Sequence, residues 1–284
     1  MGRNDAYRRT LVTPTISVVI PTHKRCEYLR IALKSVCEQS VQPSEIFVID
    51  DAGDDATRSL VCEMSREVSG DLIYHTKKPD DYGGASSVNY GATLSRGEVL
   101  AFLDDDDRWA PNYLRDALER LSRVDGAVYT AMMVDRGDSI HPYKCLPQNL
   151  NSQNIWKHIA LYNPGAQMSN LVIYRKVFID LGKVDVSMYP ASYDKDLFIR
   201  LLDAGYSYDV QKLPNVIYRR HGGNESKPSL DFASGLEIFY EKYHLRKASK
   251  VFTARTKLRV QYFKMRVSQH KWKNIIAHVV KYFL

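Results

Sequence analysis

The sequence predicts an α/β fold whose mainly parallel sheet carries helices on both faces. Short apolar, β-branched runs typical of buried strands alternate with segments of helical spacing over residues 16–135. Such alternation is typical of parallel sheets, because each helix returns the chain to the same edge. Two of the expected strands run directly into acidic residues, at Asp50-Asp51 and at 104–107. Ligands of these sheets bind beyond the carboxyl ends of the strands, so a functional site is expected there.

The elements of the first half follow one another in regular order. The expected strands cover 16–20, 45–49, 72–75, 99–103 and 127–134. Apolar residues recur at helical spacing in 29–37, 60–68, 86–95 and 114–121. One helix is therefore expected between each strand and the next.

The second half is less regular. Residues 136–168 are rich in polar and loop-forming residues, and no repeating pattern predicts their fold. A strand is expected over 171–174, and a helix over 193–204 with Gly205 as its C-cap. This half is expected to shape the part of the site that selects a substrate.

Charge is distributed unevenly along the chain. The 284 residues have a formal net charge of +7, but eleven of the 40 Lys and Arg lie after residue 244, where there is no Asp or Glu. The first 244 residues are therefore net acidic, which argues against a nucleic-acid-binding core. A basic end of this kind is suited to an anionic surface.

The last residues predict a basic amphipathic helix. Its apolar stripe consists of Trp272, Ile275, Ile276, Val279, Val280 and Phe283. Such a helix binds a membrane interface as a peripheral anchor, or docks on the protein itself or on a second subunit. No signal peptide or membrane-spanning stretch is recognised, and the four cysteines lack metal-type spacing. A cytoplasmic location at the inner face of the cell membrane is expected.

The most informative stretch is 102–109, where an apolar strand runs into four consecutive carboxylates. Like charges a few ångströms apart raise one another's pKa or recruit a cation. Mg²⁺ and Mn²⁺ bind carboxylate oxygen and commonly share it with a substrate phosphate. Two interpretations follow: a site for a metal and a diphosphate, or an acidic turn that caps the helix starting near Pro111.

Several blocks, taken in order, resemble the family 2 inverting glycosyltransferases, which have the GT-A fold. They read SVVIPTHKR from residue 17, VIDDAGDDAT from 48, NYG from 89, RGE from 96, FLDDDDRW from 102, DKDLFIR from 194 and YRRH from 218. The resemblance implies a Rossmann-like domain at 16–240, with a nucleotide-sugar half at 16–135 and an acceptor half at 136–240. An N-terminal extension at 1–15 and a basic helical tail at 241–284 flank it.

The resemblance implies a nucleotide-sugar donor, expected to be a UDP-sugar. The residues assigned to it are Pro21, Thr22, Arg25, Asp50, Asp51, Asn89, Asp104 and Asp105. A carboxylate such as Asp51 accepts hydrogen bonds from a ring N–H or a sugar hydroxyl. The structural alternatives are a turn at Asp50-Asp51 and an exposed helix-start charge at Arg25.

The quartet contains the D-x-D motif of the family. The resemblance implies that Asp104 and Asp106 hold Mn²⁺ or Mg²⁺, with His221 as a further ligand, while Asp107 holds the loop or caps the next helix. Such an ion neutralises the charge that develops on the leaving diphosphate. A structural role is the alternative for His221. Trp109 and Trp156 either stack on sugar rings or pack in the core.

Asp194 is expected to be the general base, by its match to the catalytic carboxylate of the family. Apolar neighbours at the start of its helix would desolvate it, which raises its pKa and makes it a better base. The alternative is a helix cap. Tyr193 stands where the family usually has Glu. Asp196 and Arg200 are expected to pair at the helix surface or to position Asp194.

The expected function is transfer of one sugar to a hydroxyl of a glycan or lipid-linked glycan, in the synthesis of a surface or capsular polysaccharide. A single in-line displacement would invert the anomeric configuration. Two alternatives stay open. One is a transferase whose acceptor is a polyprenyl phosphate, which needs less base catalysis. The other is a protein that binds a nucleotide sugar without turnover.

Overall fold

The computed structural model describes residues 14–77, 83–155, 159, 163–224, 229–247, 258, 260–262 and 264. The strands are β1 (Ile16–Thr22), β2 (Glu45–Asp50), β3 (Asp71–Thr76), β4 (Val99–Phe102), β5 (Arg108–Trp109), β6 (Ala127–Asp135), β7 (Ile140–Lys144), β8 (Leu171–Tyr174) and β9 (Tyr208–Arg219). The α-helices are α1 (Cys26–Cys37), α2 (Asp55–Met64), α3 (Gly84–Leu94), α4 (Tyr113–Leu121), α6 (Arg175–Asp180), α7 (Tyr193–Asp203) and α8 (Leu230–Lys247). Two short 3₁₀ helices are η1 (Met168–Asn170) and η2 (Val186–Met188).

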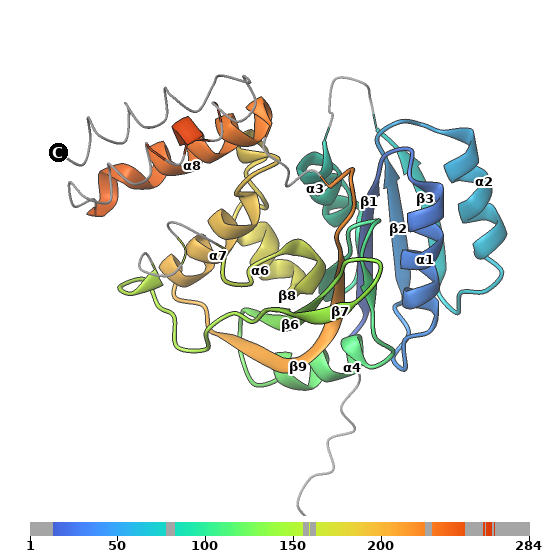
Figure 1. Ribbon diagram of the computed structural model, residues 1–284. Coiled ribbons are helices and arrows are strands. Elements are labelled where there is room, and N and C mark those ends of the chain that lie inside the picture. The colour runs from blue at the N-terminus through green and yellow to red at the C-terminus, as the bar shows by residue number, and fades with distance from the viewer. Residues whose placement is uncertain are drawn as a thin grey trace, which may run out of the picture.

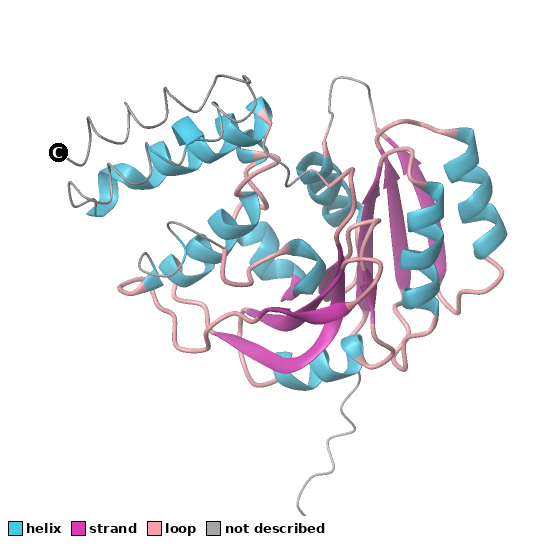
Figure 2. Ribbon diagram, in the orientation of Figure 1, coloured by secondary structure: helices cyan, strands magenta, loops and turns pink. Residues whose placement is uncertain are grey.

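All of these strands belong to one sheet. Its order is β3-β2-β1-β4-β8-β6-β9-β5, and β7 pairs with β6 beside this path. β1 lies between β2 and β4 and is parallel to both, so the carboxyl ends of these three strands meet at one edge. β8 joins the two halves of the sheet by antiparallel pairing with β4 and β6. Figures 1 and 2 show helices on both sides of the sheet, which confirms the predicted α/β fold.

The alternation of side chains along β1 explains the two layers of helices. Val18 and Ile20 pack in one core cluster with Leu29 of α1, whereas Val19 packs in the other with Val88 of α3. Successive side chains of a strand point to opposite faces, so one buried strand supports helices on both. Gly91 lets α3 approach β1 closely, because a Cβ at this position would lie 2.4 Å from Cγ1 of Val19.

Three strands were not expected from the sequence: β5, β7 and β9. β9 interrupts its buried positions with three exposed residues, 212–214, and its pairing with β6 shifts register nearby. β7 is exposed along most of its length and contains Pro142. β9 alternates apolar and polar residues only over 208–211, before the exposed stretch that contains Pro214, and β7 has no clear period-two pattern. These three strands bring the loops of the second half toward the carboxyl ends of β1, β2 and β4.

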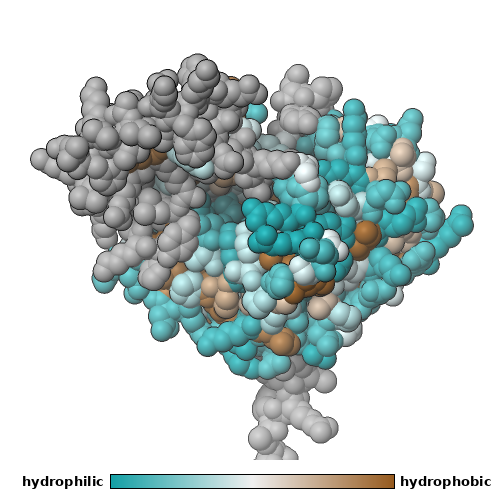
Figure 3. Space-filling model, viewed as in Figure 1, coloured by the Kyte–Doolittle hydropathy of each residue, from teal (hydrophilic) through white to brown (hydrophobic). Residues whose placement is uncertain are grey.

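α8 packs on the body of the protein. Leu236, Phe239, Tyr240 and Tyr243 are buried in the core cluster that also contains α7, and Figure 1 shows α8 lying over α7. The boundary predicted between residues 240 and 241 falls inside this helix. The amphipathic segment predicted at 272–283 lies outside the described residues. Figure 3 shows a mainly hydrophilic surface with small apolar patches over the described part of this face. Within that described part of the chain, none of the helices has the length and apolar composition needed to cross a membrane.

Candidate active site

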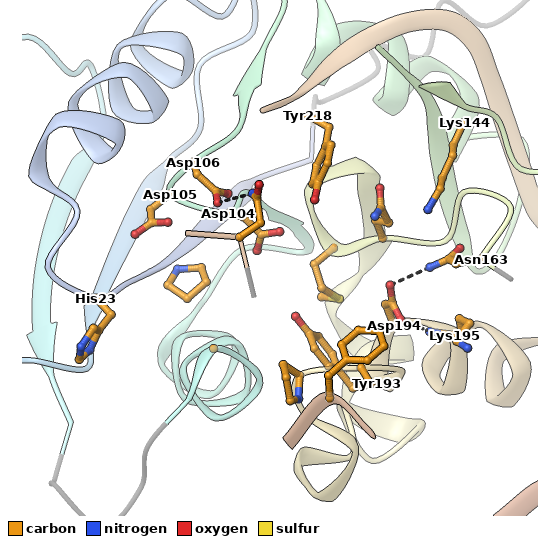
Figure 4. Close-up of a pocket in the computed structure, with 18 of the residues that line it drawn as sticks. His23, Asp104, Asp105, Asp106, Lys144, Asn163, Tyr193, Asp194, Lys195 and Tyr218 are labelled. Atoms are coloured by element: carbon orange, nitrogen blue, oxygen red, sulfur yellow. Dashed lines mark hydrogen bonds between the residues drawn. The ribbon is translucent and has the colours of Figure 1, made fainter. Parts of the chain in front are cut away.

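A cavity of about 690 Å³ opens where the carboxyl ends of β1, β2 and β4 meet the loops of the second half. Eight of the residues singled out from the sequence line it: Pro21, Thr22, Arg25, Asp51, Asp104, Asp105, Asp106 and Asp194. Figure 4 shows Asp104, Asp105 and Asp106 on one side, Asp194 on the other and Tyr218 between them. We call residues 104–107 the acidic loop. Asp106 and Asp194 are 88 positions apart in the sequence, yet the acidic loop and Asp194 face the same cavity.

Parallel pairing of β1 with β4 brings the end of β1 against the acidic loop. The Thr22 hydroxyl donates to Oδ2 of Asp105 over 2.7 Å. Nη1 of Arg25 lies 3.0 Å from Oδ1 of Asp105 and 3.4 Å from Oδ2 of Asp106. Arg25, expected at the nucleotide, thus partly neutralises the carboxylates beside it.

His221 contacts the acidic loop and helps to fix the side chain of Asp106. Nε2 of His221 is 2.8 Å from Oδ2 of Asp106, and the side-chain amide of Asn224 donates to the same oxygen over 3.1 Å. The backbone N–H of Gly223 donates to Nδ1 of His221. Because Nδ1 accepts, the neutral ring carries its proton on Nε2 and donates it to Asp106. In this arrangement His221 orients the carboxylate of Asp106. Its expected role as a metal ligand stays a prediction.

The quartet carries more negative charge than its partners offset. Burial raises the pKa of Asp105 to about 6, with Arg25 acting in the opposite direction. Burial, with Asp106 and Asp104, also raises the pKa of Asp107. Oδ1 of Asp107 accepts from the backbone N–H of Arg219, whereas its buried Oδ2 has no hydrogen-bond partner among the described residues.

Asp107 holds its loop to β9 and does not cap a helix. The N-cap residue of α4 is Asn112, which makes no side-chain capping hydrogen bond. The interpretation of the quartet as an acidic helix cap is therefore wrong. The sequence proximity of the quartet to α4 suggested the cap, but the unexpected pairing of β5 with β9 separates them.

The carboxylates of the acidic loop fit a divalent cation whose remaining ligands come from the substrate. Within the described ranges, no group of three or more His, Cys, Asp or Glu side chains is arranged to hold a metal ion. Mg²⁺, however, is commonly bound by one or two carboxylates together with substrate phosphates. Asp104 and Asp106 both line the cavity and supply such carboxylates. Besides burial, Asp106 and Asp104 both raise the pKa of the neighbouring Asp107, as carboxylates of like charge do, and a cation at this loop would reduce that repulsion.

Asp50 and Asp51 differ in their surroundings. Asp50 is fully buried and does not line the cavity: its carboxylate accepts from the backbone N–H of Ala52 and Asp54 and from the Tyr74 hydroxyl. Asp51 lines the cavity, 3.2 Å from the buried ammonium of Lys77.

The chain's own residues occupy most of the acceptor capacity of Asp51. The carboxylate also accepts from the Ser87 hydroxyl and from the backbone N–H of Gly83, just before α3. A carboxylate offers about four lone-pair directions, so about one remains for a ligand.

Asn89 also lies outside the cavity. Its side-chain amide donates to the carbonyl oxygen of Val184 and accepts from the backbone N–H of the same residue. This pair of bonds holds α3 to the segment before η2. The block NYG at 89–91 is thus explained by packing, through the clamp at Asn89 and the close approach at Gly91.

Asp194 lies in the first turn of α7 and points into the cavity (Figure 4). Oδ2 accepts a hydrogen bond from Nδ2 of Asn163 over 2.8 Å, and Oδ1 accepts from the backbone N–H of Lys195. Burial raises the pKa of Asp194 to about 6, while the charges of Lys195 and Lys144 act against this rise. A carboxylate with this pKa is largely ionised at pH 7 and remains a competent base.

Sequence reasoning missed the residues that surround Asp194. They are Asn163 from a loop, Tyr143 and Lys144 from β7, Tyr218 from β9, and Phe232 and Leu236 from α8. Tyr218 is the first residue of the block YRRH, but the resemblance implied no role for it. For Asn163 and β7 the sequence carries no periodic signal, since both lie in the irregular stretch 136–168.

Asp196 and Arg200 form the expected pair, but the carboxylate is buried and Arg200 is half-buried, so the expected location at the helix surface is wrong. Asp196 is 0% exposed, and Nε of Arg200 lies 2.7 Å from its Oδ2. The Tyr243 hydroxyl donates to Oδ1 of Asp196 over 2.5 Å, and the Lys242 ammonium lies 2.8 Å away. α8 covers this face of α7, which the spacing of α7 alone could not reveal.

Trp109 packs in the core and is 3% exposed. Its ring stacks on Tyr113, and its Nε1–H donates to the carbonyl oxygen of Ser169. It is therefore closed to a sugar ring. Trp156 lies outside the described residues.

An acidic loop at the carboxyl ends of parallel strands, across a cavity from a carboxylate of raised pKa, is typical of the active site of an α/β enzyme. The chain belongs to glycosyl transferase family 2, whose model matches residues 17–182. This membership agrees with the resemblance in the sequence blocks.

Relatives and solved structures agree with this family. An uncharacterised glycosyltransferase of Rickettsia felis is 28% identical over 197 residues, which are 66% of this chain and 31% of that protein. The amylovoran biosynthesis glycosyltransferase AmsB of Erwinia amylovora is 26% identical and matches 76% of this chain and 75% of its own length. The chain thus spans about a third of some relatives and three quarters of another. S. aureus TarS 1-349, in complex with UDP-GlcNAc, has the same fold with a TM-score of 0.65 at 15% identity, over 94% of this chain and 80% of that one.

Proposed function

We propose that this chain transfers a sugar from a UDP-sugar to a hydroxyl of a glycan, with inversion at the anomeric carbon. The observation that carries the proposal is the opposition of Asp194 and the acidic loop across one cavity. The glycan acceptor is supported by AmsB, whose name assigns it to amylovoran biosynthesis. The UDP donor is supported by TarS, which binds UDP-GlcNAc.

The donor would bind along the first-half side of the cavity. Thr22 and Asp51 stand at the ends of β1 and β2, where the remaining lone pair of Asp51 is suited to a uracil N–H or a ribose hydroxyl. The diphosphate would then extend toward the acidic loop. This places the anomeric carbon near the middle of the cavity, between Asp106 and Asp194.

Asp104 and Asp106 would hold a Mn²⁺ or Mg²⁺ ion together with the diphosphate. When bound, such an ion neutralises charge on the leaving nucleoside diphosphate. Through its hydrogen bond, His221 would keep Asp106 in the orientation required. Arg25 would hold Asp105 and Asp106 in place.

Asp194 would take the proton of the acceptor hydroxyl as that oxygen bonds to the anomeric carbon. The bond from this carbon to the diphosphate oxygen breaks in the same displacement, and its electron pair leaves with UDP. Asn163 and the backbone N–H of Lys195 fix the carboxylate, so the base is oriented before the substrate binds. Proton transfer by a positioned base contributes about 10²–10⁴-fold to a rate.

Two other functions give different results in the same assay. A polyprenyl phosphate acceptor is already ionised, so Asp194→Asn would leave most of the activity. A protein that binds nucleotide sugars without turnover would release no UDP.

The predicted helix at 272–283 would anchor the enzyme at the inner face of the cell membrane. This cytoplasmic, membrane-associated location stays a prediction.

The test is UDP release from nucleotide sugars in the presence of Mn²⁺ and a mixture of glycan acceptors. We expect release by the wild-type protein and a loss of about 10²–10⁴-fold in Asp194→Asn. Asp203→Asn, an exposed carboxylate at the other end of α7, is the matched control and should retain full activity. Equal rates in Asp194→Asn and in the control would reject Asp194 as the base.

A further inference from the structure

We propose that the acceptor glycan is anionic, and that its acidic group binds Lys144 beside the stacked rings of Tyr143 and Tyr218. This inference deepens the proposed function and rests on it. The acidic group would be the carboxylate of an acidic sugar or a phosphate carried by the glycan. Both are suited to an ammonium partner, since either forms a charge-assisted hydrogen bond with it.

The two tyrosines form one aromatic wall of the cavity. Tyr143 of β7 and Tyr218 of β9 stack with ring centroids 5.3 Å apart and an angle of 14° between their planes. Both line the cavity, and Tyr143 is 36% exposed. Aromatic side chains with a few polar groups among them are the usual lining of a ligand site. A sugar ring can place its C–H face on such a wall.

Lys144 adds a positive charge at this wall. Its Nζ lies 4.7 Å from the centre of the Tyr143 ring, a cation–π contact that helps to hold the ammonium in place. Figure 4 shows the side chain extending into the cavity, toward the side where Asp194 and Asn163 lie. The ammonium is close enough to Asp194 to lower its pKa against the effect of burial.

The position of Lys144 favours the acceptor over the donor. The diphosphate would lie by Asp104 and Asp106, and Figure 4 shows Tyr218 between these carboxylates and Lys144. The hydroxyl that attacks must approach from the side of Asp194. A cation on that side therefore meets the acceptor.

Lys195 also lines the cavity, and against the effect of burial its charge lowers the pKa of Asp194 more than that of Lys144 does, but its side chain is held against α8. Its Nζ lies 4.3 Å from the centre of the Phe239 ring in α8, and the side chain is buried. Lys144 is the better candidate to bind an acceptor because it is only half-buried and lies next to the aromatic wall.

The test compares two probes that differ in one acidic group: p-nitrophenyl glucuronide and p-nitrophenyl glucoside. Affinities are measured by NMR titration with UDP and Mn²⁺ at saturation, so that the donor side is filled. Glucose 6-phosphate against glucose forms a second arm, which separates phosphate from carboxylate. The variants are Lys144→Met and Tyr143→Leu, with Lys212→Met, an exposed lysine of β9, as the control.

We expect the wild-type protein to bind the anionic member of at least one pair about tenfold more tightly, as one hydrogen bond between charged groups predicts. Lys144→Met should abolish this preference and Lys212→Met should keep it. Tyr143→Leu should weaken both members of a pair. Absence of the preference in both arms, or its persistence in Lys144→Met, would overturn the inference.

The result separates this inference from the proposed function. If the wild-type protein releases UDP from nucleotide sugars but binds charged and neutral probes equally, the inference is wrong and the function stands. If Lys144→Met changes the pH dependence of UDP release but leaves the preference for the anionic probe, Lys144 only tunes Asp194, and the inference is also wrong. If no nucleotide sugar binds, the proposed function itself fails.

Discussion

Asn163 donates a hydrogen bond from Nδ2 to Oδ2 of Asp194 over 2.8 Å, and Asn163 is itself held by the backbone of its own loop. Its Oδ1 accepts from the backbone N–H of Gly165 and of Ala166. Its Nδ2 also donates to the carbonyl oxygen of Ala166, so a loop residue with four hydrogen bonds orients the candidate base. This is the role of a positioning residue, which acts through Asp194.

Replacing Asn163 by Ala should slow UDP release by about tenfold, the value of a hydrogen bond to a charged group. Loss of a donor to the ionised form of Asp194 should also raise its pKa, so the acidic limb of the rate should move to higher pH. The measurement is the rate of UDP release as a function of pH. Asn154→Ala, which also removes a loop asparagine with backbone contacts, is the control and should leave the profile in place. A slower variant with an unmoved limb would show that Asn163 acts only on structure.

The raised pKa of Asp194 has opposite effects on activity and on stability. The base works when ionised, so the rate should fall as the pH drops through about 6. Because the folded-state pKa lies above the usual value, the native state binds the proton more tightly than the unfolded chain does. The contribution of Asp194 to stability is therefore present at pH 4 and is lost as the pH rises through 6.

Asp194→Asn removes this titration. Its midpoint of thermal unfolding, relative to the wild-type protein, should be higher at pH 8 than at pH 5, although the variant has lost activity. Differential scanning calorimetry at both pH values makes the comparison. A variant that is less stable at pH 8 than at pH 5, relative to wild type, would contradict the assigned pKa.

The acidic loop should make UDP binding depend on a divalent cation. Asp104→Asn and Asp106→Asn should each weaken UDP binding in Mn²⁺ by at least about tenfold, because each removes a charged oxygen ligand. Isothermal titration calorimetry with and without Mn²⁺ measures the effect. Asp138→Asn, an exposed carboxylate in the turn after β6, is the control. Equal affinities of the wild-type protein for UDP with and without Mn²⁺ would contradict a role for the metal in UDP binding.

Asp196 should matter for stability. Asp196→Ala leaves the half-buried Arg200 and the more exposed Lys242 without this carboxylate, and loss of a hydrogen bond between charged groups costs about 1.5–3 kcal/mol. Urea denaturation measures the change in the free energy of unfolding. Asp185→Ala removes the second, more exposed partner of Lys242 and a cap of η2, which should cost only about 1 kcal/mol. Similar losses in the two variants would mean that the buried contact between α7 and α8 is weak.

The order of strands and helices in the first half could be predicted because each element has its own periodic pattern. β1 and β2 are continuous buried runs, and α1 shows its apolar residues at helical spacing. β9 could not be predicted, since Pro214 and exposed neighbours interrupt its pattern. Its shape depends on pairing with β6, which is distant in sequence.

The residues of the candidate site also divide into those that could be predicted from the sequence and those that could not. The acidic loop could be predicted because four carboxylates after an apolar run are a local feature of the sequence, and Asp194 was predicted from the resemblance of its block to the family. The sequence could not reveal Asn163 or Lys144, whose importance comes only from the distant residues that they approach. The buried state of Asp196 likewise depends on α8, through Tyr243.

In the proposed mechanism, the acidic loop and Asp194 serve one substrate in one cavity. The decisive experiment is a crystal structure with UDP and Mn²⁺. We expect a diphosphate beside Asp104 and Asp106 within the cavity, with open space between it and Asp194. Nucleotide bound elsewhere on the protein, with the acidic loop facing only solvent, would contradict this mechanism.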